Sequence, residues 1–213
     1  MANKNNRQVW LVLTLLVLTS GSIMAGIMLR SPGIREMRRA AYIQWTESGE
    51  NNLRRTKTID GITYKCIYQP APYLAVRHLS SNIPAAIIDS LIRQQEGFHY
   101  ISLEISSEDP DNTVLDPTTL SPETYNARLQ YLNAMAQSDL KMIEGGDTLH
   151  CTQYLFENPY NLSKTVHLIA AFKRLHPENR DVQLIFNDRL MQNGLIRFTF
   201  DQETLNQIPK LIY

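Results

Sequence analysis

The stretch RRTKTIDGITYKCIYQP, residues 54–70, decides the fold class because it describes a β-hairpin. Asp60 and Gly61 form the two-residue signal of a tight hairpin turn, and β-favouring runs flank the pair on both sides. Side chains in a strand alternate between its two faces. In the run after the turn, Tyr64, Cys66 and Tyr68 lie on one face. The stretch therefore predicts two antiparallel strands with one apolar face.

Helices and further strands follow this hairpin. Residues 84–97 and 121–138 have helical patterns, the second with Ser121 as its cap and Pro122 in the first helical position. The segments predicted as strands are 98–106, 147–157, 164–174, 181–186 and 194–200, the last two joined by a turn at Asn193 and Gly194. Residues 203–213 predict only a terminal turn or tail. This order predicts an α+β fold, in which an N-terminal transmembrane helix precedes a mainly antiparallel β-sheet domain with two or three helices.

Residues 9–29 carry no charged side chain. At about 1.5 Å per helical residue this length covers the roughly 30 Å hydrocarbon core of a bilayer. We expect a retained anchor that contacts the lipid bilayer, preceded by a short basic tail over residues 1–8. A cleaved signal peptide and a buried helix of a soluble core are the alternatives. The apolar residues that continue after Ser22 favour retention over cleavage.

The basic residues around this stretch leave its orientation open. Lys4 and Arg7 precede it, and a cluster at residues 30–39 follows it. Lys and Arg near the ends of a span set its topology. We expect a single-pass protein with an extracytoplasmic C-terminal domain, or a secreted one if the stretch is cleaved. Residues 30–52 predict an amphipathic juxtamembrane connector, and residues 53–213 predict a single α+β domain.

Charge and cysteine content limit the classes of function. Lys plus Arg and Asp plus Glu each total 21 residues, so no basic excess points to nucleic acid as a partner. The basic cluster at 35–39 lies beside the apolar stretch and fits contact with anionic headgroups better. The pair Cys66 and Cys151 is compatible with one disulfide in an oxidising compartment, and equally with two free thiols.

No catalytic motif is present in the sequence. There is no G-x-S-x-G, no phosphate-binding glycine loop and no histidine or cysteine pair at zinc-ligand spacing. The acidic loop that contains Asp109, Asp111 and Asp116 lacks the glycine and glutamate of an EF-hand. We therefore expect no metal, no cofactor and no catalytic residue.

The segment YLFENPYN, residues 154–161, is rich in aromatic side chains. Tyr154, Phe156 and Tyr160 are the candidates for ligand binding, because aromatic residues with polar tips are favoured on binding surfaces. Cross-strand packing in a sheet is the alternative role for the same residues.

These observations predict a membrane-tethered, non-catalytic protein whose β-rich domain binds a protein partner or supports an envelope assembly. The alternative is an exported enzyme or small-ligand receptor whose site forms only in the fold. Under that alternative, Glu104, His99, His150 and Asp188 are the residues to inspect, and two or more of them would share one pocket. His99 is also expected on an apolar strand face, where a core histidine is typical.

Overall fold

The computed structural model describes residues 35–80, 82–109, 113–157 and 164–213. Within this part, residues Glu36–Tyr213 form one compact unit. The predicted anchor at 9–29 lies outside the described residues, as do the connector residues before Arg35. In the part of the chain that the structure describes, no helix is both long enough and apolar enough to cross a membrane.

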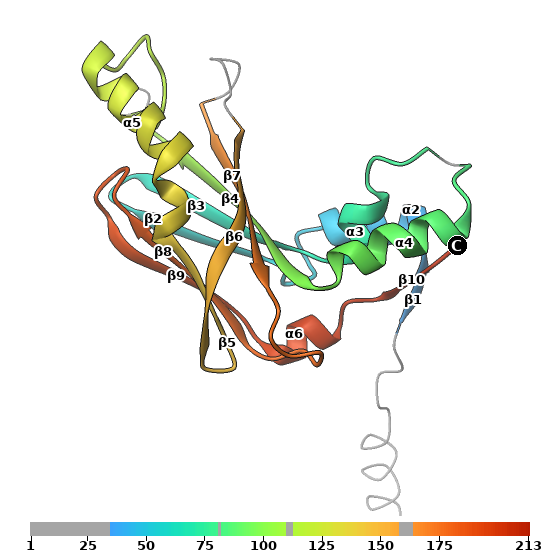
Figure 1. Ribbon diagram of the computed structural model, residues 1–213. Helices are drawn as coiled ribbons and strands as arrows, with labels where there is room; N and C mark the ends of the chain where they lie inside the picture. Colours follow the sequence, from blue (N-terminus) through green and yellow to red (C-terminus); the bar gives the residue numbers. More distant parts are fainter. Residues whose placement is uncertain (1–34, 81, 110–112, 158–163) are drawn as a thin grey trace, which may run out of the picture. The chain divides into compact units, whose positions relative to one another are not determined.

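The main element of the unit is an eight-stranded sheet in which every neighbouring pair is antiparallel. Its strands, in spatial order, are β2 (Arg54–Ile59), β3 (Ile62–Gln69), β4 (Phe98–Ser107), β7 (Val166–Lys173), β6 (Asp147–Glu157), β5 (Leu140–Glu144), β8 (Val182–Asp188) and β9 (Gly194–Phe200) (Figure 1). The mainly antiparallel sheet predicted from the sequence is therefore confirmed.

The predicted hairpin is the β2–β3 pair. Asp60 and Gly61 have positive φ angles of 48° and 74°. A tight two-residue turn of this kind needs positive φ at both central positions, which Asp and Gly tolerate best. The turn sets the register in which Ile59 lies opposite Ile62.

The sheet curls around one core and forms a nearly closed barrel. Strands from its whole width contribute to the same cluster of buried side chains, for example Tyr64 on β3, Leu103 on β4, Leu168 on β7, Leu184 on β8 and Phe198 on β9. Except for Leu103 on β4, each of these residues belongs to an alternating series of buried positions in its strand. Because alternate side chains point to the same face, the inner face of the curled sheet is the core.

Helix α5 (Pro122–Ala134) and the short 3-10 helix η1 (Ala136–Asp139) lead into β5. The helix begins as predicted, since the Ser121 side chain accepts a hydrogen bond from the Thr124 amide at 3.2 Å. The Leu132 side chain of α5 packs in the barrel core. The sequence did not predict β5 as a strand, because residues 140–144 directly follow the helical pattern.

The remaining elements form a second cluster, which we call the helical lobe. It consists of β1 (Glu36–Arg38), α2 (Arg39–Glu47), α3 (Ala71–Val76), α4 (Ala85–Gln95) and β10 (Lys210–Ile212), and a short helix α6 (Gln202–Asn206) precedes β10 (Figure 1). Trp45 and Ile208 pack against both the lobe and the barrel core.

Two features of the lobe differ from the sequence predictions. The expected terminal tail contains β10, which pairs with β1 in parallel. The expected connector contains α2, which buries Tyr42 and Thr46 inside the compact unit. The folded unit therefore starts before residue 53, because a short apolar stripe from each end of the chain is buried in the same cluster.

Candidate functional site

Two buried polar clusters lie inside the barrel. The first, the His99 cluster, joins β3, β4 and β5. Tyr68 Oη lies 3.0 Å from His99 Nδ1, and His99 Nε2 lies 3.0 Å from Glu144 Oε1. The other carboxyl oxygen of Glu144 accepts a hydrogen bond from the Leu175 amide at 2.8 Å. Since a carboxylate only accepts, His99 Nε2–H donates to Glu144, and Nδ1 accepts from the Tyr68 hydroxyl.

Burial in this cluster favours the neutral forms of His99 and Tyr68. Burial lowers the pKa of His99, and the Glu144 carboxyl opposes that shift without cancelling it. Burial also raises the pKa of Tyr68 to about 12. The side chains of His99 and Glu144 are both fully buried. A substrate has no access to them here, so the cluster stabilises the fold, as expected for a core histidine.

The second cluster, the Asp188 cluster, joins β8 to β3 and to the turn before β9. Asp188 Oδ2 accepts from the Tyr64 hydroxyl at 2.6 Å and from the Asn193 amide at 3.3 Å. Asp188 Oδ1 accepts from the amides of Leu190 and Met191, each at 3.0 Å. Burial and the bond to Asp188 together raise the pKa of Tyr64. Four donors thus surround one buried carboxyl group.

The four residues that the enzyme or receptor hypothesis singled out do not meet. His99 and Asp188 belong to the two separate clusters above. Glu104 accepts from Lys65 Nζ at 2.7 Å on the other face of β4, and His150 is exposed on β6. An enzyme or receptor site was expected to bring two or more of these residues into one pocket, so their separation is evidence against such a site.

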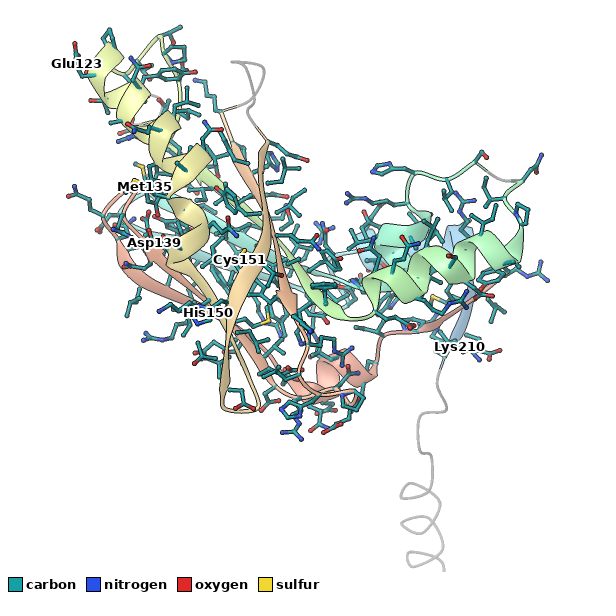
Figure 2. All side chains as sticks on the ribbon, viewed as in Figure 1. Glu123, Met135, Asp139, His150, Cys151 and Lys210 are labelled. Atoms are coloured by element: carbon teal, nitrogen blue, oxygen red, sulfur yellow. The ribbon has the colours of Figure 1, made fainter. Side chains whose placement is uncertain are left out.

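His150 and Cys151 do share a surface groove of about 400 Å³, next to the η1 helix that ends at Asp139 (Figure 2). Burial raises the pKa of the Cys151 thiol to about 11, so the reactive thiolate is scarce at neutral pH. The Cys151 thiol donates to the Gln153 carbonyl at 3.1 Å. The groove therefore does not contain an activated nucleophile.

The suggested disulfide is absent, because Cys66 and Cys151 are both free. Cys66 lies on β3 and Cys151 on β6, with β4 and β7 between these strands. Three strand spacings of about 4.8 Å exceed the separation that a disulfide spans. Sequence spacing could not reveal this separation, since it depends on strand order.

The aromatic candidates Tyr154 and Phe156 take part in packing. Phe156 is buried in the barrel core. The Tyr154 hydroxyl donates to the Leu132 carbonyl of α5 at 2.7 Å. The third candidate, Tyr160, lies outside the described residues. For the first two residues, the packing alternative is the one that the structure shows.

The barrel is interrupted between its two edge strands, and we call the line between β2 and β9 the seam. Among the described residues, no backbone hydrogen bond joins these two strands. At one end, Asn193 Nδ2 donates to the Ile59 carbonyl at 3.3 Å and to the Tyr64 hydroxyl at 2.8 Å. Side chains, not a backbone ladder, hold the seam together there.

At the other end, the Arg55 guanidinium lies between the two backbones. Nη1 donates to the carbonyls of Asn52 at 2.6 Å and Arg54 at 3.1 Å, and Nε donates to the carbonyl of Thr199 on β9 at 3.1 Å. The guanidinium carbon lies 5.4 Å from the ring centre of Phe200. Along the same strand, Lys57 Nζ lies 5.9 Å from the ring centre of Phe198. Two cations thus cover the aromatic core at the seam.

Sequence reasoning missed the seam. Its one local signal is the pair of basic residues Arg55 and Lys57 on β2, which alternate toward the same face as Ile59. Inward-pointing charges of this kind are characteristic of an edge strand. The sequence does not indicate which other edge they meet.

A second groove, of about 550 Å³, lies in the helical lobe and is lined by Arg38, Arg39, Ile83, Ile88, Ile212 and Tyr213. The Arg39 guanidinium donates to the carbonyls of Val76, Leu79 and Ser80 at the end of α3 and just after it. Its charge therefore holds the α3–α4 connection.

Among the described residues, no group of three or more His, Cys, Asp or Glu side chains is placed to hold a metal ion.

Taken together, the fold and the seam define a small, mainly antiparallel β-sheet protein with a nearly closed barrel and a few helices. No family model matches the sequence, and no curated protein matches it. One solved structure is similar, a DUF4426 family protein from Pseudomonas aeruginosa PAO1. It is 9% identical with a TM-score of 0.33, and the match covers 70% of this chain and 92% of that one.

Proposed function

We propose that this chain is a membrane-tethered, non-catalytic protein whose β-rich domain binds a protein partner or supports an envelope assembly. The observation that carries the proposal is the filled barrel interior. The side chains of its polar residues His99, Glu144 and Asp188 are buried and hydrogen-bonded within the protein. Recognition is therefore expected on the outer surface and at the strand edges, the parts of a sheet on which proteins commonly dock.

The tether in this proposal rests on the sequence. Residues 9–29 are uncharged and long enough to span a bilayer, and Arg30 follows them directly. Carbonate extraction of membranes that contain the full chain tests it. We expect the protein to stay in the membrane pellet. The variant with both Leu15→Arg and Leu16→Arg should be released, since two charges inside a span oppose insertion. Release of the unaltered full-length protein would show that the tether is wrong.

Partner binding is tested separately with a photo-crosslinking residue at Leu195, an exposed position on β9. We expect one discrete cross-linked product in intact cells, heavier than the chain alone. The same crosslinker at Lys141, an exposed position on β5 two strands from β9, reports whether the product depends on position. Absence of any product at both positions would contradict partner binding.

A further inference from the structure

We propose that the seam between β2 and β9 accepts an extended, acidic strand of a protein partner, which displaces the Arg55 guanidinium and pairs with both edges. The inference rests on the proposed function and specifies the partner's contact.

The backbone direction of β2 follows from its neighbours. The Leu53 carbonyl accepts from the Tyr68 amide at 2.8 Å, so Leu53 faces β3. Backbone groups of successive residues in a strand point to opposite edges. Arg54, Thr56 and Thr58 therefore direct their N–H and C=O groups into the seam. The Arg54 carbonyl agrees with this, since it accepts from Arg55 Nη1.

The opposite edge presents the same kind of groups. The Thr199 carbonyl accepts from Arg55 Nε, so Thr199 faces the seam, and Arg197 does so by the same alternation. The two edges thus offer donors and acceptors to each other without pairing directly. An exposed edge of this kind is a template for an added strand.

Arg55 occupies the position that such a strand would take. One guanidinium donates to carbonyls of the β2 edge and to a carbonyl of the β9 edge, as the backbone amides of a strand between them would. Paired strands lie about 4.8 Å apart and leave no room for a guanidinium between their backbones. At Arg55 the two edges are therefore bridged by a side chain and not by a backbone ladder. Its side chain is 29% exposed, so it can swing out into water.

The charge at the seam determines the chemistry of the occupant. The strand β2 carries Arg54, Arg55 and Lys57, and β9 carries Arg197, while neither strand contains Asp or Glu. Asp201, just after β9, lies 3.8 Å from Arg55. Arg55 and Lys57 point to the inner face of the sheet, and Arg54 and Arg197 to the outer face. An acidic strand with Glu or Asp at alternate positions would supply carboxylates to the pair on one face.

The orientation of the inserted strand is also constrained. Following the antiparallel pairs around the sheet, β2 and β9 run in opposite directions. One strand between them would be antiparallel to one edge and parallel to the other. Mixed pairing of this kind is common in large sheets.

Binding to the full chain in detergent micelles tests the proposal. The probe is a fluorescent ten-residue peptide in which Glu alternates with Val and Thr. Two control peptides have the same length: one with Lys in place of Glu, and one with alternate backbone nitrogens methylated. We expect the acidic peptide to bind at least about tenfold more tightly than either control. Equal binding of the methylated peptide would mean a charge contact without strand pairing, and would overturn the proposal.

Hydrogen exchange locates the contact. We expect the amides of Thr56, Thr58, Arg197 and Thr199 to become protected when the acidic peptide binds. Protection of one edge only, or of neither, overturns the proposal. If the same amides become protected with rising protein concentration and no peptide, the occupant is a second copy of this chain, which also overturns it.

Charge reversal supplies a matched pair of variants. The double variant Lys57→Glu with Arg197→Glu should reverse the preference, so that the Lys peptide binds more tightly. The control Lys65→Glu reverses one charge on β3, on the same outer face as Arg197 but paired with Glu104 and outside the seam. It should keep the preference for the acidic peptide. A seam that only protects the edges from aggregation would bind no peptide up to about 1 mM, and that result would also refute the inference.

These results are separable from the proposed function. A cross-linked product at Leu195 without peptide binding would keep partner binding and reject the seam as its site. Peptide binding in a chain that carbonate releases would keep the seam and reject the tether.

Discussion

The substitution Asp188→Asn tests the account of the barrel core most directly. It keeps the size and shape of the side chain and changes one oxygen into an NH2 group. The Asn oxygen can still accept from the Leu190 and Met191 amides. The new NH2 group, however, then faces the Tyr64 hydroxyl and the Asn193 amide, which are both donors to Asp188.

The expected magnitude follows from those two contacts. Hydrogen bonds to a charged group contribute about 1.5 to 3 kcal/mol each, and Asp188 is 1% exposed, so water does not replace them. Losing two at the lower value costs about 3 kcal/mol of the free energy of unfolding. For a domain of this size, that loss lowers the melting temperature by roughly 6 to 12 °C.

Urea unfolding of the full chain in detergent micelles, followed by circular dichroism, measures the change. The control Asp147→Asn makes the same chemical change at a side chain that is 57% exposed and pairs with His176. It should alter the free energy of unfolding by less than about 0.5 kcal/mol. If Asp188→Asn costs under about 1 kcal/mol, the buried network does not have the role assigned to it.

Three further measurements address other parts of the structure. Because burial lowers the pKa of His99, its unfolded form binds a proton at a higher pH than its folded form. The contribution of His99 to the free energy of unfolding is therefore fully present above about pH 6.5. It falls as the pH drops below that value, by at most about 1.4 kcal/mol per pH unit. We expect His99→Gln to flatten the profile of unfolding free energy against pH. Because burial raises the pKa of both thiols, a maleimide at pH 7 should label Cys151 slowly and Cys66 more slowly still, measured by mass spectrometry of the intact chain. A disulfide between Cys66 and Cys151 under non-reducing conditions would contradict the strand order. Ser121→Ala should cost about 1 kcal/mol by removing the cap of α5, and an unchanged urea midpoint would argue against that cap.

Local patterns determined much of the fold. The Asp60-Gly61 turn, the alternation around Tyr64 and the Ser121 cap each depend on residues within a few positions of one another. For that reason they could be interpreted without the tertiary structure. Strand β5 was not predicted, because its five residues, Leu140–Glu144, directly follow a helical pattern and have no turn signal before them.

The position of His99 follows from the sequence, but its partners do not. Alternation along residues 98–106 placed it on the apolar face of its strand, and the structure confirms that it is fully buried. Its partners could not be predicted. Tyr68 and Glu144 come from strands 31 and 45 residues away in the chain, and only the order of strands in the sheet brings them together.

The sequence by itself determined the alternating strands, the hairpin turn and the balanced charge, since these follow from residue type and short-range spacing. The tertiary structure alone decided that the sheet curls until β2 faces β9, with Arg55 between them. Strand pairing is non-local: which edges meet depends on the order of all eight strands and on the curl of the sheet around its core. The seam, the two buried polar clusters and the separation of the two cysteines all follow from that arrangement.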